Sequence, residues 1–225
     1  MGRGCSDESV AAESNDEPLR LMIYDRTCHT EARIVGLSTA WSAGARLYRA
    51  LGRLDAANGV STWDEALAWL ATHEAGRPIS EIQFWGHGKW GCAFVDRQPF
   101  DASALRAGHP LRKPLDAVRE RLVPGGEALF WFRTCETLGA ARGLDFAPRL
   151  ADHLGARVAG HTFVIGVLQS GLHGVHPGSL PDWSAHEGLA EGTPEAPVRA
   201  LGSGPRKPRT ISCFDGEIPE GWLSR

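Results

Sequence analysis

The sequence predicts an α/β fold in which a mainly parallel sheet is flanked by helices. Three short apolar runs, at residues 19–24, 79–85 and 127–132, are typical of buried strands. Segments with helical periodicity separate these runs, and turns rich in Gly and Pro mark their ends. Strands that alternate with helices form βαβ units, which build parallel sheets covered by helices on both faces.

Composition divides the chain of 225 residues into a tail, a domain and an irregular end. Residues 1–17 are polar and acidic and contain no aromatic side chain, so we expect a flexible N-terminal tail. We expect residues 18–225 to form a single domain. Within it, residues 171–225 are rich in Gly, Pro and His and show no clear periodicity. A long segment of this kind often shapes a functional site.

In the first half of the domain, the sequence pattern predicts two strands and two helices. The strands are the apolar runs at 19–24 and 79–85. A helix is expected from about 37 to 54, and a second helix begins at a capping box at 61–64. Gly and Pro at 76–78 end the second helix.

In the second half, helical periodicity alternates with further apolar runs. The expected helices cover 114–123, which has Pro at its first position, and 142–154, which Gly155 stops. The expected strands are, in chain order, 92–95 within a hairpin that starts at Gly91, then 127–132, 156–159 and 162–167.

Charge and cysteine content narrow the class of protein. The formal net charge of −3 gives no reason to expect nucleic acid or an anionic membrane as a partner. No apolar run approaches the roughly 20 residues that cross a bilayer. The 5 cysteines are widely spaced and form no C-x-x-C motif, which argues against a disulfide scaffold and a structural zinc site. We therefore expect a cytoplasmic protein, and no P-loop motif points to a nucleotide cofactor.

Two of the predicted strands lead into reactive side chains. The run 79–85 is followed by His87 between two glycines, and the run 127–132 is followed by Cys135. The carboxyl ends of parallel strands meet at one edge of a sheet, where the sites of such folds form. We therefore expect the His87 imidazole and the Cys135 thiol at the same edge.

An imidazole beside a thiol is the machinery of nucleophilic catalysis. A free thiol has a pKa of about 8.5, so it needs a base that withdraws its proton at neutral pH. The imidazole can then protonate the leaving amine. Gly88 has no Cβ, so a substrate carbonyl can approach the backbone, where the N–H groups of Gly88 and Cys135 are expected to form an oxyanion hole. The alternative is an ordinary core cysteine and a turn histidine.

These segments resemble the caspase-like cysteine peptidases, a group that includes caspases, metacaspases, gingipains, separases and bacterial CHAT-type domains. In this family an apolar strand ends in His-Gly and a later strand delivers the nucleophile, about 50 residues further on in caspases. Residues 132–137 and the helix after them look most like the CHAT-type branch, and the resemblance covers about 19–170. It implies a three-layer caspase-like fold with His87 as general base and acid, Cys135 as nucleophile and Gly88 as oxyanion contributor.

The resemblance also places a specificity pocket beside the nucleophile. The residue two before the cysteine lines this pocket and is Gln in caspases and Asp in metacaspases that cleave after Arg or Lys. Here it is Arg133, whose guanidinium suits a carboxylate, so we expect cleavage after an acidic residue. The loop after the first strand also contributes in this family and offers Asp25, Arg26 and Arg33. If Asp25 neutralises Arg133 instead, the preference reverses.

Other residues have weaker claims on the site. Ser170 follows a predicted strand and is expected to wall the substrate cleft. Trp183 either stacks on a substrate residue or caps the core, which is the commoner place for a tryptophan. His161, His173 and His176 do not make a complete ligand set, so no metal is expected.

The leading hypothesis is a cysteine endopeptidase that hydrolyses protein or peptide substrates without a cofactor. Activation by a partner protein, or by self-cleavage, stays open. One rival is a catalytically inactive caspase-like domain that binds other proteins. Another is a different hydrolase or a transferase built on the same sheet.

Overall fold

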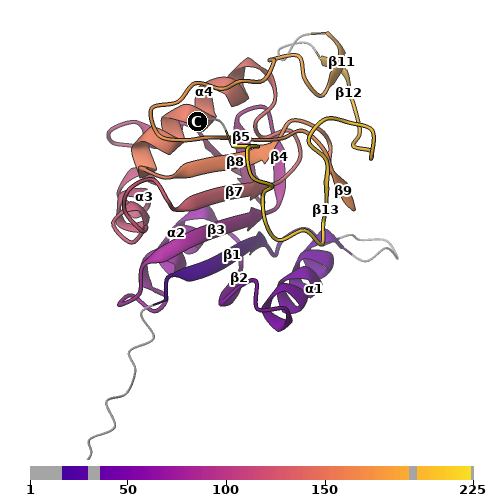
Figure 1. Cartoon of the computed structure of the whole chain (residues 1–225). Coiled ribbons are helices and arrows are strands. Elements are labelled where there is room, and N and C mark those ends of the chain that lie inside the picture. The colour runs from indigo at the N-terminus through magenta and orange to yellow at the C-terminus, as the bar shows by residue number, and fades with distance from the viewer. Residues whose placement is uncertain (1–16, 30–35, 193–196, 224–225) are drawn as a thin grey trace, which may run out of the picture.

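The computed structural model describes residues 17–29, 36–192 and 197–223. These residues form an α/β fold with three layers, in which a six-stranded sheet lies between elements that cover both faces (Figure 1). The predicted fold class is therefore confirmed. Apart from Glu17, the tail expected at residues 1–17 lies outside the described ranges, and so does Arg33.

The central sheet has the strand order β10-β8-β7-β3-β1-β2. Its strands are β1 (Leu19–Asp25), β2 (Ala56–Val60), β3 (Ile79–Trp85), β7 (Leu129–Arg133), β8 (Arg157–His161) and β10 (Leu172–Val175). All neighbours pair in parallel except β10, which is antiparallel to β8. The sheet is mainly parallel, as the alternation of strands and helices predicts.

Strands β3 and β7 lie side by side in the middle of the sheet, and their register places Trp85 opposite Arg133. Each has a neighbour on both sides and is covered on both faces, which explains their almost continuously apolar sequences. Alternation along β7 sends Phe130 and Phe132 to one face and Trp131 and Arg133 to the other. Both strands end at the same edge of the sheet.

The helices are α1 (Leu37–Ala50), α2 (Trp63–Thr72), α3 (Arg112–Arg119) and α4 (Ala140–Leu154), with a short 3-10 helix η1 (Ala102–Leu105). Helices α2, α3 and α4 pack on the face that carries Phe132, where they form the largest core cluster. Helix α1 packs on the opposite face through Ala45 and Tyr48. Beside α1, the C-terminal segment covers the same face, and Ile211 there contacts the cluster around Trp131 (Figure 1).

Local capping explains where two helices begin and end. The N-cap of α2 is Thr62, one residue later than the predicted box. Its Oγ1 accepts the N–H of Glu65 at 3.1 Å, while the Glu65 carboxylate accepts the N–H of Ser61 at 2.8 Å. Helix α4 ends at Gly155, as predicted, with a left-handed φ of 61°. No helix within the described ranges is long and apolar enough to cross a membrane.

Several elements differ from the sequence-based expectation. The pattern misses β2 and starts α3 at Pro114 instead of Arg112. Residues 162–167, predicted as a strand, form a loop between β8 and β9. The expected hairpin is part of a separate three-stranded sheet, β4-β5-β6. The remaining strands are β4 (His87–Lys89), β5 (Cys92–Val95), β6 (Gln98–Asp101), β9 (Leu168–Gln169), β11 (Leu189–Gly192), β12 (Pro197–Ala200) and β13 (Ile211–Ser212).

Candidate active site

The β4–β5 hairpin and the turn after β7 are joined directly at the carboxyl edge of the sheet. His87 is the first residue of β4, and Cys135 lies in the turn between β7 and α4. The N–H of Trp90 donates to the carbonyl of Glu136 at 2.8 Å, and the N–H of Gly91 donates to the carbonyl of Thr137 at 2.8 Å. These two hydrogen bonds fix the segment that carries His87 against the segment that carries Cys135.

Gly88 allows this close approach. A Cβ at position 88 would lie 2.7 Å from the carbonyl oxygen of Cys135 and 2.8 Å from Thr134 Oγ1, and closer still to Thr137 Oγ1. No side chain fits there without moving the turn. This packing explains why position 88 is a glycine without reference to a substrate. The role of its N–H in an oxyanion hole stays a prediction.

The Cys135 thiol is half-buried and contacts the loop that follows β8. Its Sγ accepts the N–H of Ile165 at 3.4 Å and lies 3.8 Å from the Ile165 carbonyl. Burial raises the pKa of this thiol, the Ile165 hydrogen bond opposes that effect, and the nearby Glu136 carboxylate adds to it. A thiol in this environment needs a base before it can act as a nucleophile.

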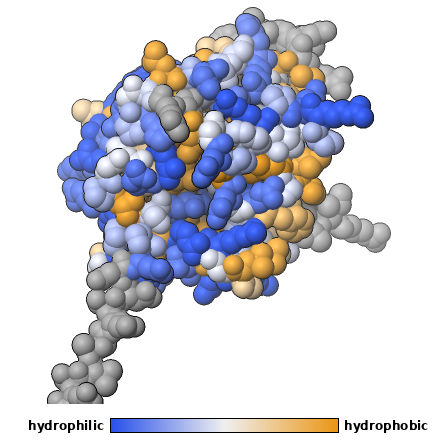
Figure 2. All heavy atoms as spheres, in the orientation of Figure 1, coloured by the Kyte–Doolittle hydropathy of each residue, from blue (hydrophilic) through white to orange (hydrophobic). Residues whose placement is uncertain are grey.

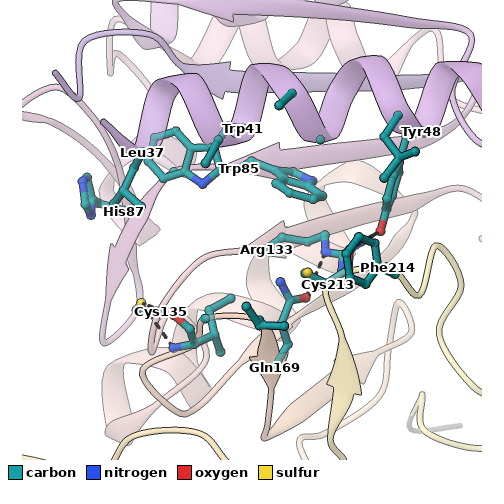
Figure 3. Close-up of a pocket in the computed structure, with 18 residues that line it drawn as sticks. Leu37, Trp41, Tyr48, Trp85, His87, Arg133, Cys135, Gln169, Cys213 and Phe214 are labelled. Atoms are coloured by element: carbon teal, nitrogen blue, oxygen red, sulfur yellow. Dashed lines mark hydrogen bonds between the residues drawn. The ribbon is translucent and has the colours of Figure 1, made fainter. Parts of the chain in front are cut away.

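His87 is exposed, and its imidazole has a different neighbour from the one expected. Nε2 lies 3.2 Å from the sulfur of Cys28, in the loop after β1. Trp41 of α1 contacts the ring edge-on, with a centroid distance of 5.6 Å and an angle of 76°. The described hydrogen bonds do not join His87 to Cys135, although both side chains line the same cavity (Figure 3).

This cavity has a volume of about 530 Å³ and opens between α1, the ends of β3 and β7, and the C-terminal segment. Its walls are mostly apolar and aromatic. They include Trp41, Leu47, Tyr48, Trp85, Ile165, Val167 and Phe214, together with the polar Arg133 and Gln169 (Figure 3). Val167 is 68% exposed and Phe214 is 58% exposed, so the rim itself is apolar. Figure 2 shows hydrophobic residues at the surface on the side where α1 and β13 lie.

Arg133 lies in the wall of the cavity and is only 2% exposed. Its Nε and Nη2 donate to Gln169 Oε1 at 3.0 and 2.7 Å, and its Nη1 donates to the Tyr48 hydroxyl at 2.6 Å. The guanidinium also stacks on Trp85 and Trp131, 4.7 and 4.4 Å from the ring centroids.

The acceptors of Arg133 are neutral groups, completed by the carbonyls of Asp215 and Ser212. Among the described residues, no carboxylate forms an ion pair with it, and Glu81 acts on it only through space. Burial lowers the pKa of Arg133, which reflects the cost of a positive charge away from water. The cavity wall therefore carries a buried cation whose hydrogen bonds are satisfied but which has no direct ion-pair partner among the described residues.

Asp25, the residue considered as a partner for Arg133, is engaged elsewhere. Its carboxylate accepts the N–H of Thr27 at 2.8 Å and the N–H of Asp96 at 3.1 Å. Arg26 does not line the cavity. Its Nε donates a hydrogen bond to Ser61 Oγ at 2.7 Å, and its guanidinium forms an ion pair with Glu65 of α2. The structure thus leaves the charge of Arg133 without the neutralisation by Asp25 that would reverse its preference.

Ser170 and Trp183 do not line the cavity either. Ser170 is fully buried, and its Oγ donates to the Gly204 carbonyl at 3.0 Å. Trp183 belongs to the core on the opposite face of the sheet, where its Nε1 donates to the Leu138 carbonyl at 2.9 Å. Of the residues proposed for substrate binding that lie in the described ranges, the structure brings Arg133 alone to the cavity that His87 and Cys135 share.

Two of the histidines considered as metal ligands have protein partners. The Nδ1 of His161 lies 3.2 Å from the Ser170 carbonyl, and burial lowers the pKa of this histidine to about 3. The Nε2 of His173 lies 2.6 Å from Glu187 Oε1, and its Nδ1 lies 2.8 Å from Arg209. No group of three or more His, Cys, Asp or Glu side chains in the described residues is arranged to hold a metal ion.

Residues 86–91 match the pattern G-x-G-x-x-G, which marks dinucleotide-binding loops when a helix follows the glycines. Here the segment forms β4 and the turn into β5, so that structural context is not met.

The structure adds cavity residues that the sequence pattern did not single out. Trp41 and Tyr48 are seven positions apart on α1 and share its buried side, so helical periodicity contains a signal for them. Gln169 and Cys213 line the cavity from β9 and from the turn after β13, and Cys28 contacts His87 from the loop after β1 without lining the cavity. No local pattern points to these three residues.

Comparisons with known proteins do not identify a family for this chain. No protein-family model matches the chain, and a search of curated proteins finds no significant match.

Proposed function

We propose that the protein is a cysteine endopeptidase of the caspase-like type, in which Cys135 is the nucleophile and His87 is the general base and acid. The observation that carries this proposal is the delivery of both side chains by adjacent parallel strands to one cavity. Their order in the chain and the hydrogen bonds between their segments agree with it.

In the proposed reaction, the imidazole takes the proton of Cys135, and the thiolate attacks the scissile carbonyl. The tetrahedral intermediate collapses to a thioester, and the imidazolium gives its proton to the leaving amine. A water molecule, deprotonated by His87, then attacks the thioester and releases the acid product and the free thiol. The His87 imidazole must come into hydrogen-bond contact with the Cys135 thiol for the first step. Catalytic hydrogen bonds often tighten only when substrate binds, so we expect this contact to form in the substrate complex.

The lack of a direct ion-pair partner for Arg133 among the described residues supports a preference for an acidic residue before the scissile bond. A carboxylate that enters the cavity would supply a direct ion-pair partner in a site largely shielded from water, where such pairs are strong. A protein or peptide is thus the substrate. Four described cysteines are free thiols, which is compatible with the proposed cytoplasmic location.

One observation favours a second candidate, an inactive domain that binds proteins. His87 contacts Cys28, and the sulfur of Cys135 contacts the backbone of Ile165, so the two reactive groups have other partners in this conformation. The apolar rim around Val167 and Phe214 suits a bound peptide whether or not it is cleaved.

A peptide library separates the two candidates. The wild type is expected to cleave peptides with Asp or Glu before the scissile bond, and Cys135→Ala and His87→Ala are expected to abolish cleavage. Cys92→Ala is the matched control, because Cys92 is a half-buried thiol of β5 outside this cavity. Cleavage by Cys135→Ala at the wild-type rate would contradict the proposal. Binding of the same peptides without cleavage would favour the inactive domain.

A further inference from the structure

Cys28 is a second thiol at the proposed active site, and it contacts the imidazole directly. Its sulfur lies 3.2 Å from His87 Nε2, whereas the described contacts of the Cys135 sulfur are with Ile165. A neutral imidazole has one nitrogen that donates and one that accepts. Whatever occupies Nε2 therefore determines what the other nitrogen, Nδ1, can do.

The loop that carries Cys28 is fastened on several sides. The single proton of the Ser38 hydroxyl is shared between two carbonyls, that of Cys28 at 3.0 Å and that of Asp25 at 2.9 Å. The Asp25 carboxylate holds the N–H of Asp96, in the turn between β5 and β6. The N–H of Arg26 donates to the carbonyl of Val60 at 3.0 Å. Cys28 is thus anchored to α1, to β2 and to the sheet whose first strand bears His87.

Trp41 restricts the imidazole from another direction. It contacts His87 edge-on from α1, and the N-terminal turn of that helix contains the Ser38 that anchors the Cys28 loop. The helix, the loop after β1 and the hairpin therefore act together on one ring. His87 is exposed, and within the described ranges its ring contacts Cys28 and Trp41.

We infer that Cys28 is the positioning residue of His87: its sulfur accepts the Nε2–H, so that the lone pair of Nδ1 is left to receive the proton of Cys135. This inference rests on the proposed function. The proton of the Cys135 thiol moves to Nδ1, the Nε2–H stays on the Cys28 sulfur, and no electron is transferred. A base that is oriented by a third group is a general arrangement in nucleophilic catalysis. Here the thiol of Cys28 is the group that orients His87.

The role predicts different effects for two substitutions at the same position. Cys28→Ser keeps an acceptor for Nε2–H and is expected to stay close to the wild type. Cys28→Ala removes the acceptor, and because sulfur is a weak acceptor, a loss of about fivefold in the reactivity of Cys135 at neutral pH is expected. A fivefold change in the thiolate population moves the midpoint of the pH dependence upward by about 0.7 units.

The test measures alkylation of Cys135 by iodoacetamide as a function of pH, quantified by mass spectrometry of the peptide that contains it. This readout needs no peptide substrate, and Cys28 is followed separately on its own peptide. We expect Cys28→Ala to raise the midpoint for Cys135, Cys28→Ser to restore it, and Cys92→Ala to leave it unchanged. Thermal unfolding of each variant shows whether the fold is kept.

His87→Ala separates failure of the inference from failure of the proposed function. If His87→Ala leaves the pH dependence of Cys135 unchanged, the proposed pair itself is refuted. If His87→Ala raises the midpoint but Cys28→Ala does not, the pair stands and the role of Cys28 is refuted. A faster alkylation of Cys135 in Cys28→Ala would also refute it, because Cys28 would then withhold the imidazole.

Discussion

Gly88→Ala tests the close approach of the two segments that carry His87 and Cys135. The new Cβ would lie 2.7 Å from the Cys135 carbonyl oxygen and 2.8 Å from Thr134 Oγ1, while ordinary contacts of a Cβ begin at 3.4 Å. The obstacle includes backbone, so β4 must move away from the turn. Overpacking of this kind costs about 1–3 kcal/mol.

For a chain of this length, about 2 kcal/mol corresponds to a fall in the melting temperature of roughly 4–8 °C. The displacement also separates His87 from Cys135, and a misplacement of about 1 Å can lower a catalytic rate about 100-fold. Thermal unfolding followed by circular dichroism, and the rate of peptide cleavage, measure the two effects.

Gly76→Ala is the matched control. Its added Cβ would meet no atom within 4 Å, and its backbone lies outside the left-handed region, so it should melt at or slightly above the wild-type temperature. If Gly88→Ala melts and cleaves like Gly76→Ala, the segments that carry His87 and Cys135 are not packed against each other as described.

Three further predictions follow from buried groups. Arg133→Gln should lower cleavage after an acidic residue by about 100-fold and cleavage after a neutral residue much less, as expected when a buried carboxylate loses its cation; equal losses in kcat/KM would show that Arg133 serves the fold alone. The pKa of His161 falls from 6.5 to about 3 on folding, so the unfolded chain binds the proton more readily. As the pH falls from 6.5 to about 3, the free energy of unfolding of the wild type should therefore decrease by up to about 1.4 kcal/mol per pH unit. Urea unfolding of His161→Gln should show a weaker dependence of this free energy on pH. Trp183→Phe removes one buried hydrogen bond and should destabilise the fold by at least about 1 kcal/mol without changing KM, whereas a raised KM would favour contact with substrate.

The sequence predicts the centre of the sheet because its strands have a strong local signal. β1, β3 and β7 are buried on both faces, and burial of that kind requires a continuous apolar run. Since parallel strands end at one edge, the same runs also predict that His87 and Cys135 lie near each other. Helices α2 and α4 have clear periodicity and end signals, and their predicted limits differ from the observed ones by few residues.

Elements that depend on distant partners are not predictable in this way. β2 contains Asn58 and Gly59, which normally indicate a turn, and it forms a strand because it pairs with β1 at the sheet edge. The apolar run 162–167 has the composition of a strand but forms the loop that brings Ile165 to Cys135. Cys28 and Gln169 reach the site through the paths of their loops, for which the sequence has no local code.

Covalent trapping of the nucleophile tests the proposed pair of Cys135 and His87 most directly. A peptide with a terminal acidic residue and a thiol-reactive ketone group is incubated with the folded chain, and the modified residue is identified by peptide mapping. We expect a single adduct on Cys135, strongly reduced by His87→Ala and unaffected by Cys92→Ala. An adduct on Cys28 with Cys135 left free, or labelling of Cys135 at the same rate without His87, would contradict it.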